Sequence, residues 1–215
     1  GDAPSTIPKI SGDGQSILFL SESSRLSESD SNNAEDIFLF DRRTNRVRQI
    51  SVSSQGNGAN RASSQLSVSG NGSQVLFISE ASNLVAPDDL FSRDLFLHDL
   101  NLQTTVRLSP PGIPVREVRG QPSQNFDGKT IAFQHVTPND PNNAWGVFVW
   151  HKDTNQYESI SLQIDNNSID LSFLDHTALS GDGKYLLVMA NSSGTAIGEH
   201  HEMFLYDMQN RSVRK

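Results

Sequence analysis

The sequence contains no cysteine, which excludes disulfide bonds, thiolate catalysis and cysteine-ligated zinc together. It also has no apolar run near the roughly 18 residues that a membrane-spanning helix needs, so no transmembrane segment is expected. Basic residues are few and scattered: 17 Lys and Arg stand against 25 Asp and Glu, a formal net charge of -8. Because nucleic acid phosphates attract clustered Lys and Arg, a nucleic acid partner is not expected.

Helical periodicity of useful length is lacking as well. The 215 residues, 35% of them hydrophobic, instead carry short apolar runs that alternate with segments rich in Gly, Ser and Asn. Such runs, when turn residues bound them, predict strands that are buried on both faces. A chain of this length can bury a substantial core, so the sequence predicts a globular all-β protein.

A four-residue turn motif recurs at nearly constant spacing along the chain. Its copies are SGDG at Ser11–Gly14, SGNG at Ser69–Gly72, NFDG at Asn125–Gly128 and SGDG at Ser180–Gly183. The final glycines of successive copies are separated by 58, 56 and 55 residues. Since glycine accepts a positive φ without a Cβ clash, each copy is predicted to close a tight hairpin.

Each repeat contains four short strand-like segments, which we call A to D. In the first repeat they are IPKIS, SILFLS, DIFLFD and RVRQIS, and counterparts follow in the other three repeats. Four-stranded sheets with two apolar faces must stack face to face, which predicts a β-propeller of four-stranded antiparallel blades. A β-sandwich is the alternative. The predicted blades span residues 7–64, 65–120, 121–175 and 176–215 of a single propeller domain.

Four blades are at the low end of the range for closed propellers. The fourth repeat also stops before any equivalent of Ile50 and Ser51. An open arc would expose the apolar faces of its first and last blades. We therefore expect either further blades in a longer propeller or association with another chain, self-association included.

The composite pattern of the first repeat, P-x-I-S-G-D-G, I-L-F-L-S-E-S-S-R-L, D-I-F-L-F-D and V-R-Q-I-S, resembles the WD-repeat-like β-propeller repeats of bacterial TolB-type proteins. The second repeat, from Leu66 to Ser109, is similar to the same family. The later repeats depart from the pattern: His151 stands where Asp41 and Asp99 stand in the first two. The resemblance implies a propeller, a periplasmic or secreted bacterial location and a scaffold for protein contacts. It implies no catalytic residue.

Long loops mark one end of the predicted blades. In an A–B–C–D meander the B–C and D–A connections lie at the same end, and here they carry the longest polar segments. These are Ser24–Glu35, Val52–Ser64, Ala81–Arg93 and Pro110–Gly120. Because loops on a rigid scaffold carry most binding sites, this end is the predicted binding face. The alternative is that the loops only decorate the scaffold.

One of these loops contains the only candidate for a cofactor site. Asp30, Asn32 and Asp36 space oxygen-bearing side chains somewhat like a calcium loop, but the turn glycine and distal glutamate of an EF-hand are missing. Asx-rich turn chemistry explains the same residues without a metal. A second cluster, Glu199–Glu202, holds neighbouring histidines, and adjacent residues on a strand point to opposite faces, so zinc is not expected there.

The sequence shows neither a nucleophile elbow nor a phosphate-binding loop, and no residue is predicted to be catalytic. It therefore predicts a non-catalytic propeller scaffold that binds a protein or glycan partner through its loop face. The alternative is a propeller domain that gates or flanks a peptidase-like hydrolase domain absent from this chain.

Overall fold

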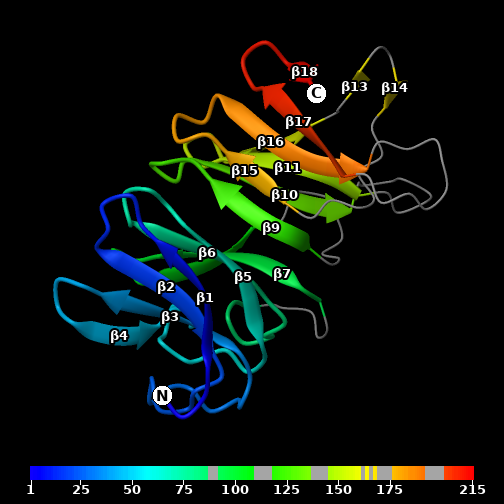
Figure 1. Cartoon of the computed structure of the whole chain (residues 1–215). Coiled ribbons are helices and arrows are strands. Elements are labelled where there is room, and N and C mark those ends of the chain that lie inside the picture. Colours follow the sequence, from blue (N-terminus) through cyan, green and yellow to red (C-terminus); the bar gives the residue numbers. More distant parts are fainter. Residues whose placement is uncertain are drawn as a thin grey trace. The chain divides into compact units, whose positions relative to one another are not determined.

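The computed structural model in Figure 1 describes most of the chain. The described ranges are residues 1–86, 92–108, 118–136, 145–160, 163–164, 167–168, 176–191 and 201–215. Every regular element within these ranges is a β-strand, and no helix in them could cross a membrane. The predicted all-β fold class is confirmed.

The strands form four four-stranded antiparallel sheets, each a simple meander in chain order. Blade 1 contains β1 (Ser5–Ile10), β2 (Ser16–Ser21), β3 (Asp36–Asp41) and β4 (Arg46–Gln49). Blade 2 contains β5 (Ser63–Val68), β6 (Gln74–Ser79), β7 (Asp94–Asp99) and β8 (Thr104–Leu108). Blade 3 contains β9 (Arg119–Gln124), β10 (Thr130–Val136), β11 (Trp145–His151) and β12 (Gln156–Ile160). Blade 4 contains β15 (Thr177–Leu179), β16 (Tyr185–Asn191), β17 (His201–Asp207) and β18 (Ser212–Arg214).

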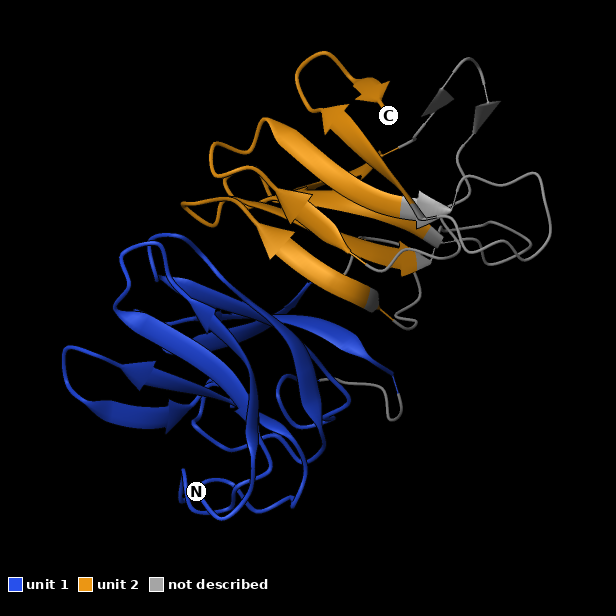
Figure 2. Ribbon diagram, viewed as in Figure 1, with its two compact units in different colours: residues 1–111, 115–117 blue, residues 112–114, 118–215 orange. Residues whose placement is uncertain are grey.

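A further two-stranded sheet, which the sequence did not indicate, pairs β13 (Gln163–Ile164) with β14 (Asn167–Ser168). The blades fall into two compact units, shown in Figure 2: unit 1 holds blades 1 and 2, and unit 2 holds blades 3 and 4.

Each unit has its own core, built where one blade covers the next. Successive side chains on a strand point to opposite faces, so each apolar run supplies both sides of its sheet. In unit 1, one face of blade 1 packs against blade 2. The residues of this contact include Leu18, Leu20, Ile37, Leu39, Leu66, Val75, Phe77 and Phe96. In unit 2 the corresponding cluster is Ala132, Val147, Val149, Ile160, Leu186, Val188, Phe204 and Tyr206.

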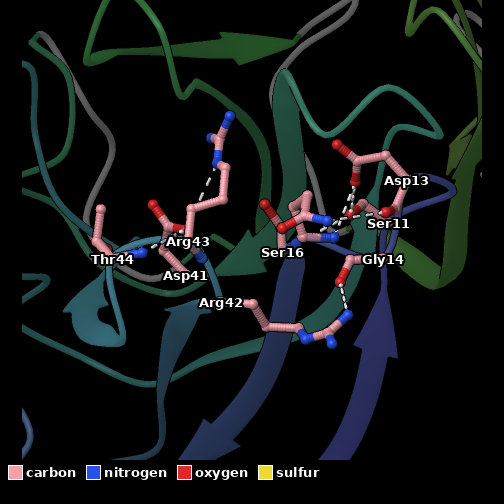
Figure 3. A network of polar contacts seen from close by, with 9 residues as sticks. Ser11, Asp13, Gly14, Ser16, Asp41, Arg42, Arg43 and Thr44 are labelled. Atoms are coloured by element: carbon pink, nitrogen blue, oxygen red, sulfur yellow. Dashed lines mark hydrogen bonds and ion pairs between the residues drawn. The ribbon is translucent and has the colours of Figure 1, made fainter.

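The repeated turn motif closes the A–B hairpin of every blade. Gly14, Gly72, Gly128 and Gly183 have φ angles of 67°, 66°, 72° and 72°, as predicted. In blade 1 the Gly14 amide donates to the Ser11 carbonyl, and the Ser11 hydroxyl donates to Asp13 (Figure 3). Asp13 in turn accepts from the Gln15 amide. Because the first and third residues of the motif satisfy the turn's polar groups locally, Ser or Asn at the first position and Asp or Asn at the third can close the hairpin in every blade.

Candidate functional site

Short and long connections lie at opposite ends of the blades in unit 1. At the short-turn end the Arg42 guanidinium donates to the Gly14 carbonyl at 2.7 Å, which joins the C–D turn to the A–B turn (Figure 3). The long-loop end is formed by residues 22–35, 50–62 and 80–86. These are the B–C loop of blade 1, the D–A loop that leads to blade 2, and the described part of the B–C loop of blade 2. We call these three segments the loop face of unit 1.

The D–A loop packs tightly against the B–C loop of blade 1. A Cβ atom placed on Gly58 would lie 2.3 Å from the Ser29 carbonyl oxygen, so only glycine permits this approach. The Asn32 amide group donates to the Ala59 carbonyl at 2.7 Å, which ties the two loops together one residue further on. The position of the D–A loop is thus fixed by backbone contact as well as by a side-chain hydrogen bond.

The same D–A loop is also bound to the B–C loop of blade 2. The Ser82 amide donates to the Asn60 side-chain oxygen at 3.0 Å, and the Asn60 side-chain nitrogen donates to the Ser82 hydroxyl at 3.0 Å. Asn83 accepts a hydrogen bond from the Asn60 backbone amide and donates one to the Gly58 carbonyl. Asn60 therefore clamps the second loop in place.

Asp2 forms the matching clamp in blade 1. It lies 58 positions before Asn60, which is the distance between the first two repeats. Its carboxylate accepts hydrogen bonds from the Ser23 and Ser24 hydroxyls and pairs with Arg25. Neither clamp was predicted from the sequence, although an Asp or Asn residue at the same repeat position indicated it.

An open pocket of about 430 Å³ lies on the loop face. Its lining residues are Ser54, Gln55, Ser82, Asn83, Leu84, Val85, Ala86 and Thr105. The polar residues offer hydroxyl and amide groups, whereas Leu84 is buried and provides an apolar floor. Such a combination can hold a small polar group against an apolar surface.

One lining residue of the pocket, Thr105, takes part in a buried polar contact. The Thr105 hydroxyl donates to the Val52 carbonyl and lies 2.9 Å from Nδ1 of His98. Burial lowers the pKa of His98 to about 4, and the charge of Arg48 adds to this effect. His98 is therefore neutral at physiological pH and fixes the loop rather than reacting as an acid.

The three residues of the predicted calcium loop are only partly brought together. The Asn32 side-chain nitrogen donates to an Asp36 carboxylate oxygen at 2.9 Å, and the Ser51 hydroxyl donates to the other at 2.6 Å. One oxygen of Asp30 is buried without a hydrogen-bond partner, and burial raises the pKa of Asp30. The Asx contacts thus satisfy Asn32 and Asp36 from within the protein.

Parts of the predicted loops and of the histidine cluster lie outside the described residues: Asp88 and Asp89 of the loop Ala81–Arg93, Glu199, His200 and most of the loop Pro110–Gly120. In the described part of the chain no three His, Asp or Glu side chains are grouped so that they could hold a metal ion. The calcium site at Asp30, Asn32 and Asp36 stays a prediction.

Comparison with known proteins supports the fold. No family model matches the sequence, and neither does any curated protein. Among solved structures, TolB from Acinetobacter baumannii is similar with a TM-score of 0.61 and 18% identity, over 98% of this chain and 43% of TolB. The β-propeller domain of the trilobed protease from Pyrococcus furiosus is similar with a TM-score of 0.59 and 15% identity, over 97% of this chain and 56% of the protease domain chain.

Dipeptidyl peptidase 4 from Porphyromonas gingivalis is also similar, with a TM-score of 0.58 and 14% identity, over 98% of this chain and 32% of the peptidase chain. The chain thus spans roughly a third to a little over half of these structures. At such low identity the likeness concerns the fold alone. It confirms the β-propeller fold and the predicted likeness to TolB-type repeats.

Proposed function

We propose that this chain is a non-catalytic propeller module that binds a protein or glycan partner through the loop face of unit 1. The observation that carries the proposal is the double attachment of the D–A loop, through Asn32 on one side and Asn60 on the other. Loops that are ordered before binding lose less conformational entropy when a partner arrives. The loop face is therefore suited to recognition rather than to mere connection.

The exposed chemistry of the loop face suits a partner rich in hydrogen-bonding groups. Gln55 and Asn57 expose uncharged amide side chains, which can both donate and accept hydrogen bonds. Peptide backbones and sugar hydroxyls present the same two kinds of group. The net charge of -8 disfavours polyanions, which leaves a protein or a neutral glycan as the fitting partner.

The periplasm or the exterior of a bacterial cell is the proposed location of this binding. The resemblance to TolB-type repeats in the sequence and the similarity to a TolB structure both favour it.

A pair of matched variants tests the loop face. Ala86 is exposed at the pocket, and Asn101 is exposed in a short turn at the other end of blade 2. Ala86→Arg and Asn101→Arg add the same side chain at these two ends. Binding to a glycan array and to envelope proteins is measured for both variants and the native chain. We expect Ala86→Arg alone to abolish the binding; equal effects of the two variants would contradict the proposal.

A propeller domain that gates or flanks a hydrolase is the second candidate. It is favoured by the match to the propeller domain of a protease and by a match that occupies only 32% of a peptidase chain. Sequencing the native gene distinguishes the two candidates. A reading frame that continues into a hydrolase domain favours the second, and hydrolysis should then depend on the propeller.

A further inference from the structure

One face of blade 4 is apolar and exposed. Met203, Tyr185, Leu205 and Leu187 are 62%, 43%, 39% and 36% exposed. Leu187 is paired directly with Leu205 in the ladder between β16 and β17, and Met203 is paired with Met189, so these side chains share one face. The residues that alternate with them fill the core of unit 2. Within the part of the chain that the structure describes, blade 4 therefore has one packed face and one exposed apolar face.

The same positions in blade 1 are buried in a blade–blade interface. The β2–β3 ladder pairs Leu18 with Leu39 as the β16–β17 ladder pairs Leu187 with Leu205. Leu18 and Leu39 are 0% and 1% exposed, because they belong to the core cluster shared with blade 2. The exposed face of blade 4 is thus the repeat equivalent of the face with which blade 1 covers blade 2.

Blade 1 carries the complementary face on its other side. A single row of cross-strand partners runs through Ile10, Ile17, Phe40 and Val47. Ile10 is 59% exposed and Val47 36%, while Ile17 and Phe40 are half-buried. In blade 2 the equivalent row includes Val75, which belongs to the core cluster shared with blade 1. The chain therefore exposes both halves of the interface that it uses internally.

We propose that the exposed face of blade 4 binds the Ile10–Val47 face of blade 1 in a second copy of this chain. The contact joins two different faces, so it is heterologous. Apolar burial on both sides supplies the driving force.

A recurring cross-blade pair supports this choice of partner. Arg48 on β4 acts electrostatically on His98 of blade 2, and the equivalent Glu158 on β12 acts on Tyr206 of blade 4. The equivalent residue on β18 is Arg214, which is exposed. In the proposed contact Arg214 meets Phe40 of the second copy, the equivalent of His98 and Tyr206. A guanidinium over an aromatic ring is a favourable cation–π arrangement.

Light scattering after size exclusion provides the first test. The native chain is expected to self-associate above its mass of 23.6 kDa, and Met203→Asp or Ile10→Asp is expected to run as a single chain. The dissociation constant of self-association should increase by more than about tenfold, because each variant places a charge in an apolar contact. Leu102→Asp is the control, since Leu102 is 72% exposed in the C–D turn of blade 2 and belongs to neither face, so it should leave the self-association intact.

Mixing the two variants tests the head-to-tail arrangement. Met203→Asp retains an intact blade 1 face and Ile10→Asp retains an intact blade 4 face, so the mixture should form a dimer through one native contact. Circular dichroism and thermal melting verify that each variant is folded, and Leu205→Asp and Val47→Asp provide a second pair if one fails. A native chain that is monomeric at its highest soluble concentration would overturn the proposal. So would self-association that survives Met203→Asp, or two variants that do not complement each other.

Discussion

The Nη1 atom of Arg107 lies 3.6 Å from a carboxylate oxygen of the buried Asp94 in blade 2. The equivalent residues of blade 1 are Gln49 and Asp36, so the same buried carboxyl group faces a neutral amide there. Burial raises the pKa of Asp36 to about 7, although hydrogen bonds from Ser51 and Asn32 oppose the change. One repeat position thus holds an ion pair in blade 2 and a titrating group in blade 1.

Asp36→Asn is expected to change how stability depends on pH. The folded chain keeps the Asp36 proton up to about pH 7, whereas the unfolded chain releases it near its ordinary pKa of 3.8. The stabilisation is therefore complete below that ordinary pKa and is lost as the pH rises through 7. Relative to Asp36→Asn, the native chain should lose up to about 4 kcal/mol between these limits. Urea unfolding of both proteins at a series of pH values measures the difference.

The native chain has to be compared with Asp36→Asn because His98 changes the stability with pH in the opposite direction to Asp36. Its lowered pKa gives stability that is present above pH 6.5 and is lost as the pH falls through about 4. The two effects partly cancel in the native chain, but His98 is common to both proteins. Gln49→Arg is the control, since a guanidinium beside Asp36 should lower its pKa and remove the loss at neutral pH. Parallel curves for the native chain and Asp36→Asn would show that Asp36 is not perturbed.

The repeat turns were predictable from sequence because their chemistry is local. Ser11, Asp13 and Gly14 satisfy one another within four residues, so the motif itself specifies the hairpin. The strands were predictable for a related reason: an apolar run bounded by turn residues has few other solutions. The state of Asp36 was not predictable, because it depends on Gln49 and Ser51, which approach only after β3 and β4 have paired.

Gly183→Ala and Gly181→Ala should differ although both change the same turn. Gly183 has a φ of 72° and a Cβ there would lie 3.2 Å from the Asn125 side chain, so alanine should cost about 1 kcal/mol or more. Gly181 has no positive φ, and a Cβ would meet nothing closer than 3.8 Å. Thermal melting of the two variants provides the comparison. Equal melting temperatures would show that the turn does not need its glycine.

Calcium is expected to shift the melting temperature little. Asn32 presents its amide nitrogen to Asp36, and Ser51 donates to the remaining Asp36 oxygen, so a cation would have to displace these contacts. A weak site gives little stabilisation by mass action. Melting with calcium and with chelator measures the shift. An increase of several degrees that disappears in Asp30→Ala would establish the calcium site that the sequence suggested.

The loop face illustrates the limit of sequence reasoning more clearly than the core. The four long loops were identified as the binding end because a meander places them together. The clamps at Asp2 and Asn60 were missed, since neither residue lies in an apolar run or a turn motif. Each clamp acts through contacts between segments more than 20 residues apart, Asp2 with Ser23 and Asn60 with Ser82, which no local pattern encodes.

The two clamps predict which substitutions of Asn60 are tolerated, because blade 1 has aspartate where blade 2 has asparagine. Asn60→Asp should be tolerated, since a carboxylate can accept from the Ser82 amide and hydroxyl, as Asp2 accepts from the Ser23 and Ser24 hydroxyls. Asn60→Ala removes both contacts to Ser82 and should release the B–C loop of blade 2 at a cost of about 1 kcal/mol.

Amide hydrogen exchange at Ser82 measures the clamp directly, because its N–H donates to Asn60. Protection should be lost in Asn60→Ala and kept in Asn60→Asp, while amides of β6 at the centre of blade 2 stay protected in both. If the loop face is the binding surface, partner affinity should follow the exchange rate of Ser82 and not the melting temperature. Protection that persists in Asn60→Ala would show that the contacts of Asn83 with the backbone of residues 58 and 60 hold the loop, and the Asn60 side chain would then be incidental to the order of the face.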